Sequence, residues 1–178
     1  RKSFLEDKKL QEFFAKSDNI AYVKSGIYGK MSDVYKKENN LPKAIEMMQK
    51  SLKYDAENES IIRDLAKLYA ENKNPDEGLK IAKSALQKIQ DNAFNDNQVC
   101  LFDAIAECAK AKGDEKLFKS INILKEGSYN KFKKLSPEDI NFITENGIDY
   151  QKICGENGGR EQSGAMAKWV LAQIEQIH

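Results

Sequence analysis

The stretch that decides the fold reads YKKENNLPKAIEMMQKSLKY and runs from Tyr35 to Tyr54. Apolar residues recur at helical spacing on both sides of the polar turn at residues 38–40. Asparagine tolerates the left-handed conformation that ends a helix, and Pro42 suits the first turn of the helix that follows. We therefore predict two helices joined by a short turn.

The same pattern returns 34 residues further along the chain. Five positions carry the same residue in both copies, and several more carry similar residues. The identical pairs are Ile27 and Ile61, Tyr35 and Tyr69, Asn40 and Asn74, Leu52 and Leu86, and Asn58 and Asn92. Each pair falls on an apolar face or at a turn, so the chain is predicted to be an array of helical hairpins.

This spacing resembles the tetratricopeptide repeat, a helix–turn–helix unit of about 34 residues. The residues that carry the resemblance are Tyr28, Met31, Ser32, Tyr35, Ala44, Met48 and Ser51 in the first copy, and Ile62, Leu65, Ala66, Tyr69, Gly78, Ala82 and Ala85 in the second. Asn39 and Lys73 stand where the family has a turn glycine. The resemblance implies an all-α fold, a right-handed α-solenoid of antiparallel helix hairpins.

The chain is expected to form a single helical domain. Its expected parts are a partial leading hairpin at 1–24, repeats at 25–58 and 59–92, a degenerate third repeat at 93–127 and non-repeating capping helices at 128–178. A helix is expected at residues 4–16, where Leu10, Phe13 and Phe14 share one face. Trp169 is predicted to seal the apolar face at the end of the array, because end units of solenoids must cover it.

Composition and motifs argue against catalysis and against several ligand classes. Lys and Arg number 29 and Asp and Glu 28, so a net charge of +1 gives no general attraction for nucleic acid. No apolar run is long enough to span a bilayer. The only histidine is the last residue, His178, which leaves no Ser-His-Asp or Cys-His pair and no His/Cys metal cluster. The loop at residues 159–164 has glycines at phosphate-loop spacing but lacks the Lys-Ser/Thr that follows them. We expect no enzyme activity, cofactor or metal.

Cysteine usage suggests a location. Cys100, Cys108 and Cys154 are odd in number and irregularly spaced, which is not a disulfide framework. We predict reduced thiols in a cytoplasmic protein. The nearest basic residue to Cys154 in the sequence is Lys152, and we predict that this thiol is inert.

The candidate binding site is a surface. In the family that the chain resembles, the second, fifth, ninth and thirteenth residues of each repeat line a concave groove. Carried over, they are Gly26, Gly29, Asp33 and Lys37 in the first copy, Ser60, Arg63, Lys67 and Glu71 in the second, and Cys100, Asp103, Glu107 and Ala111 in the degenerate third. The two glycines either open space for a peptide backbone or merely weaken a helix start. Arg63 and Lys67 either grip a carboxylate or form a solvated pair on an exposed face.

The resemblance implies a scaffold or adaptor that binds a peptide or helical segment of a partner protein. Family members that hold the acidic end of heat-shock chaperones use a Lys/Asn clamp, and Gly29, Asp33 and Lys67 occupy those positions here, so that role is not expected. Two alternatives stay open: a homo-oligomerising structural module, and a regulatory or docking segment of a larger polypeptide, a catalytic one included. The start at Arg1 favours a fragment. Nucleic acid and membrane insertion are not expected.

Overall fold

The computed structural model describes residues 20–88, 99–130, 135–148 and 168–174. These residues form α2 (Ile20–Lys37), α3 (Leu41–Tyr54), α4 (Glu59–Glu71), α5 (Pro75–Lys88), α6 (Val99–Lys112), α7 (Glu115–Asn130), α8 (Pro137–Glu145) and a further helical stretch at 168–174. The predicted helix at residues 4–16, the loop at 159–164, Cys154 and His178 lie outside them.

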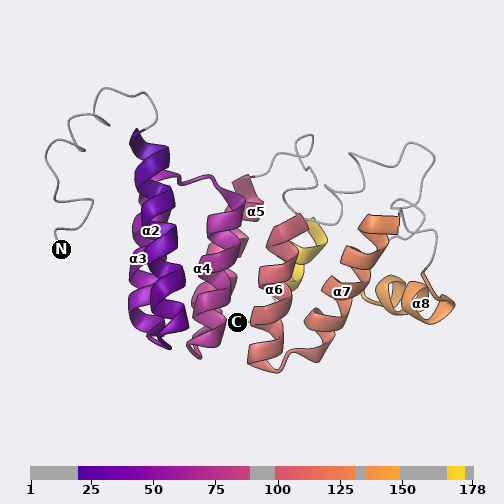
Figure 1. Cartoon of the computed structure of the whole chain (residues 1–178). Helices are drawn as coiled ribbons and strands as arrows, with labels where there is room; N and C mark the ends of the chain where they lie inside the picture. Colours follow the sequence, from indigo (N-terminus) through magenta and orange to yellow (C-terminus); the bar gives the residue numbers. More distant parts are fainter. Residues whose placement is uncertain (1–19, 89–98, 131–134, 149–167, 175–178) are drawn as a thin grey trace, which may run out of the picture.

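The helices stand side by side in one row, from α2 and α3 at one end to α8 at the other (Figure 1). The helices from α2 to α7 run in alternating directions and pack in pairs, while α8 lies across the end of the row (Figure 1). The described part of the chain contains no strand. The prediction of an all-α solenoid of helix hairpins is therefore confirmed.

The same turn closes each of the three hairpins. One residue in each turn has a positive φ, which is 56° at Asn39, 59° at Lys73 and 78° at Gly113. In each turn the next residue donates its backbone N–H to a carbonyl five residues earlier at 2.9 Å: Asn40 to Tyr35, Asn74 to Tyr69 and Asp114 to Ala109. This closure satisfies carbonyls at the end of the first helix, and its recurrence shows that α6 and α7 follow the same plan as the first two pairs.

Small residues bring the two helices together in the first and second hairpins. In the first hairpin the Ser32 hydroxyl donates to the Ala44 carbonyl at 2.8 Å, and the Ser51 hydroxyl donates to the Ser25 carbonyl at 2.8 Å. In the second, a β-carbon on Gly78 would lie 2.7 Å from the Ala66 carbonyl oxygen. Contacts this close need small side chains.

The apolar interior is divided into two clusters. The smaller one joins α3 to α4 and contains the buried residues Ala44, Ile45, Met48, Leu65 and Leu68. The larger one extends from α4 through α8 to residues 168–174. In it Trp169 is only 8% exposed, and its indole N–H donates to the Asn146 carbonyl at 2.6 Å. Trp169 therefore packs where α8 ends.

Helix α2 is longer than the sequence pattern indicated. It begins at Ile20, whereas the first repeat was expected to begin at residue 25. Ile20 and Val23 continue the apolar spacing of Ile27 in the direction of the N-terminus, and no proline separates them. Gly26 lies between them and weakens the helix without ending it. The extension lies outside the 34-residue register, and the comparison between copies therefore did not reveal it.

A candidate protein-interaction groove

A hollow of about 670 Å³ lies between the C-terminal halves of α2, α4 and α6. Its lining residues are Lys36, Lys67, Ala70, Glu71, Glu107, Lys110 and Ala111. These three helices are the first helices of the three hairpins. Two of the lining residues are alanines, and the other five are charged. We call these seven residues the lysine groove.

The structure brings some of the predicted groove positions together and leaves others apart. Lys67 and Glu71, and Glu107 and Ala111 of the third copy, line the lysine groove. The remaining predicted positions do not line it: Gly26, Gly29, Asp33, Lys37, Ser60, Arg63, Cys100 and Asp103.

Sequence reasoning missed the other three lining residues, Lys36, Ala70 and Lys110. Each is the twelfth residue of its copy, one before the thirteenth position that was chosen. On a helix the twelfth and thirteenth residues both lie about one turn after the ninth. Helical spacing alone could therefore have indicated the twelfth position as well, but the predicted set included only the thirteenth.

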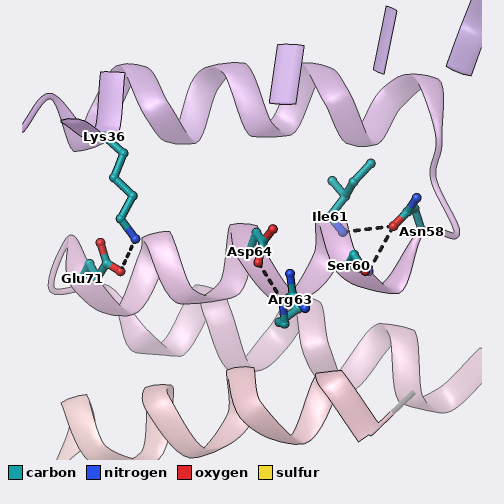
Figure 2. A network of polar contacts seen from close by, with 7 residues as sticks. All are labelled: Lys36, Asn58, Ser60, Ile61, Arg63, Asp64 and Glu71. Atoms are coloured by element: carbon teal, nitrogen blue, oxygen red, sulfur yellow. Dashed lines mark hydrogen bonds and ion pairs between the residues drawn. The ribbon is translucent and has the colours of Figure 1, made fainter. Parts of the chain in front are cut away.

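An ion pair links two of the first helices across the lysine groove. The Lys36 ammonium on α2 lies 2.6 Å from a carboxylate oxygen of Glu71 on α4 (Figure 2). Both side chains are nearly half exposed, so the pair contributes little stability. It does neutralise Glu71. Of the other charged lining residues, Lys67, Lys110 and Glu107 form no ion pair with any described residue. Two lysines therefore stand against one glutamate, and the lysine groove retains a small positive balance.

Arg63 is already occupied within the protein. Its Nε donates to an Asp64 carboxylate oxygen at 2.7 Å (Figure 2). That hydrogen bond is the main reason why the pKa of Arg63 is raised, and the charges of Cys100 and Asp103 on α6 add to it. Asp103 in turn forms an ion pair with Lys125. The N-terminal half of the α4–α6 surface is therefore paired internally, unlike the lysine groove.

Five positions remain, and each has separate surroundings. Lys37 is the last residue of α2. A β-carbon on Gly26 would meet nothing within 4 Å, whereas one on Gly29 would lie 3.8 Å from the Ser51 hydroxyl on α3. Gly29 therefore faces its hairpin partner. Asp33 lies 3.6 Å from Lys30 on the same helix. The backbone N–H of Ser60 donates to the side chain of Asn58, which caps the start of α4 (Figure 2).

The described residues offer no metal site and no activated thiol. Within the described ranges no three His, Cys, Asp or Glu residues gather where they could hold a metal ion. Burial raises the pKa of Cys100, and it raises the pKa of Cys108 to about 12. Among the helices that the structure describes, none has the length and apolar character needed to cross a bilayer.

Antiparallel hairpins in a 34-residue register, with one turn geometry repeated three times, define an α-helical repeat protein. The family comparison is more specific: residues 36–95 match the tetratricopeptide repeat model. The resemblance seen in the sequence is therefore confirmed over these residues, which make up about a third of the chain. Neither the curated proteins nor the solved structures compared with the chain give a match.

Proposed function

We propose that this chain is a non-catalytic protein-interaction module that binds a segment of a partner protein in the lysine groove. Tetratricopeptide repeats generally mediate protein–protein interactions, and solenoids use the concave surface made by successive repeats for binding. The lysine groove lies where three successive repeats meet. A cytoplasmic location is part of the proposal, supported by the free thiols Cys100 and Cys108.

The chemistry of the lining indicates what kind of segment would bind. Lys67 and Lys110 are cations without an ion-pair partner among the described residues, while Ala70 and Ala111 leave room for a backbone to approach. A partner segment with an Asp or Glu side chain would supply the missing negative charge. This observation, two lysines facing a single unpaired glutamate, Glu107, beside two alanines, carries the proposal.

A peptide selection tests it. A phage library of random 12-residue peptides is selected against the immobilised protein, and the affinity of the selected peptides is measured by fluorescence anisotropy. We expect the selected peptides to carry an acidic residue. Lys67→Glu and Lys110→Glu should each weaken their binding about 10-fold or more, since a charge-assisted hydrogen bond contributes about 1.5–3 kcal/mol.

The matched control is Lys116→Glu, which reverses an exposed charge on α7, outside the lysine groove. It changes the net charge by the same amount and should leave the affinity unchanged. Selected peptides without acidic residues, or an equal loss of affinity in all three variants, would contradict the proposal.

A further inference from the structure

The first helices of the three hairpins present equivalent apolar faces, formed by the third, seventh and tenth residues of each copy. On α4 the face consists of Ile61, Leu65 and Leu68, and on α6 it consists of Leu101, Ile105 and Cys108. Leu65 and Leu68 are 1% and 3% exposed, and the three residues of α6 are fully buried. Both faces belong to the apolar clusters of the interior.

The equivalent face of α2 is different. Its residues are Ile27, Met31 and Val34, and none of them belongs to either of the two described clusters. Val34 is 53% exposed, whereas its counterpart Leu68 is 3% exposed. All the large hydrophobic side chains that are exposed in the described residues, namely Tyr22, Val34 and Tyr54, belong to the α2–α3 hairpin.

The N-terminal extension of α2 lengthens this face. Ile20 and Val23 precede Ile27 by seven and four residues, which places them on the same side of the helix. We call Ile20, Val23, Ile27, Met31 and Val34 the α2 end face. At about 1.5 Å per residue it is roughly 21 Å long.

The two covered faces show what covers such a surface. Helix α3 packs on α4, and α5 packs on α6. In both cases the covering helix immediately precedes the covered one in the chain. The residues that immediately precede α2 are 1–19. Within them, the spacing of Leu10, Phe13 and Phe14 would place the three side chains on one face if residues 4–16 formed a helix.

Length and linkage fit the same arrangement. As a helix, residues 4–16 would be roughly 20 Å long, which matches the α2 end face. Residues 17–19 would join the two helices and span up to about 14 Å, enough for helix axes that pack about 8–10 Å apart. The corresponding link between α3 and α4 is residues 55–58, which end in Asn58, and residues 17–19 end in Asn19.

We propose that residues 4–16 of this chain bind the α2 end face as an antiparallel helix, in the way that α3 binds α4. Leu10, Phe13 and Phe14 cover the apolar side chains of α2, and the segment closes this end of the solenoid. This contact lies on a different surface from the lysine groove, so each proposal can fail without the other.

Site-specific photo-crosslinking in the full chain tests the contact. Benzoylphenylalanine replaces Val34, whose exposure leaves room for the larger side chain, and the crosslinked peptides are identified by mass spectrometry. We expect a crosslink to residues 4–16 of the same molecule. A mixture of isotopically light and heavy chains distinguishes this from a crosslink between two copies, which would overturn the proposal, as would the absence of any crosslink to residues 4–16.

The matched position is Asp33, which lies at the same level of α2 but about 100° around it. Benzoylphenylalanine at Asp33 should give no crosslink to residues 4–16. In a second set, Leu10→Ser and Phe13→Ser should reduce the Val34 crosslink several-fold, while Gln11→Ser should not. Equal crosslinking from both positions of α2, or equal yields in the three serine variants, would show that residues 4–16 do not bind this face.

Discussion

A β-carbon on Gly78 would lie 2.6 Å from the sulfur of Cys108. Gly78 is on α5 and Cys108 on α6, and the Cys108 thiol donates to the Ala66 carbonyl on α4 at 3.5 Å. Three helices thus meet at a glycine that stands where the family pattern has alanine. We expect Gly78→Ala to lower the free energy of unfolding by about 1–3 kcal/mol, the usual cost of overpacking, as measured by urea denaturation.

Gly26→Ala is the matched control, because Gly26 also lies within a helix but has open space around it. There alanine should raise the free energy of unfolding by about 0.5–1 kcal/mol through helix propensity alone. Gly78→Ala combined with Cys108→Ala should recover only part of the loss, since the Ala66 carbonyl oxygen still lies 2.7 Å from the added carbon. Stabilisation by Gly78→Ala would contradict the packing described.

The left-handed residue of the second turn gives another prediction. Lys73 has a φ of 59°, a conformation that disfavours side chains with a β-carbon. Lys73→Gly should raise the free energy of unfolding by up to about 1 kcal/mol. Asn39→Gly should raise the free energy of unfolding by a smaller amount, because asparagine tolerates this conformation better than lysine. Lys73→Ala keeps the strain and should bring no gain. Thermal unfolding of the three variants checks the order, and an equal gain from alanine and glycine would contradict it.

The Cys108 thiol predicts a loss of stability at alkaline pH. Burial, with the charges of Glu107 and Asp76, raises its pKa from an ordinary 9.0 to about 12. The folded protein therefore retains this proton while the unfolded chain releases it. The contribution of the thiol to the free energy of unfolding is complete below pH 9. It is lost as the pH rises towards 12, by at most about 1.4 kcal/mol per pH unit.

Cys108→Ala should therefore flatten the decline of the free energy of unfolding between pH 9 and 11, relative to the unsubstituted protein. The comparison between the two proteins cancels the contribution of lysines and tyrosines that titrate in the same range. Parallel curves would show that Cys108 is not the cause. Iodoacetamide at pH 8 should also fail to alkylate Cys108 until the protein unfolds, because the thiolate is scarce there.

Substitutions of Trp169 test how much its packing at the end of α8 contributes to stability. It is the only tryptophan of the chain, and its indole N–H donates to the Asn146 carbonyl at 2.6 Å. Trp169→Phe should cost about 1 kcal/mol for the lost hydrogen bond, and Trp169→Ala about 3–5 kcal/mol, since it also removes a buried ring. Urea unfolding followed by circular dichroism measures both, and equal stability of the two variants would contradict the buried position.

The hairpins and their turns could be predicted from the sequence because the 34-residue repeat marks them twice, as at Tyr35 and Tyr69. Even the replacement of the turn glycine by Asn39 and Lys73 left the turn geometry intact, since the flanking helices determine where the chain must reverse. The start of α2 at Ile20 could not be found by comparing copies, because it has no counterpart in the second repeat.

The lysine groove could be predicted only in part. Lys67 and Glu71 follow from the repeat, but whether a groove position is free or paired depends on distances between helices. From the sequence, Arg63 could be expected to be available for a partner's carboxylate. In the structure its side chain donates a hydrogen bond to Asp64. Lys36 and Glu71 are 35 residues apart and sit at different positions of their copies, so their pairing depends on how one hairpin is rotated relative to the next.

The division of the interior into two clusters has a consequence for how the protein unfolds. The α2–α3 hairpin is joined to the rest through the small cluster on α4, the Lys36–Glu71 pair and a hydrogen bond from Gln49 to the Tyr69 hydroxyl. In a linear array each unit is stabilised only by its neighbours. Amide protons of α3 should therefore exchange by a sub-global opening, at a lower free energy than those of α6. A single melting temperature would then describe neither part of the molecule.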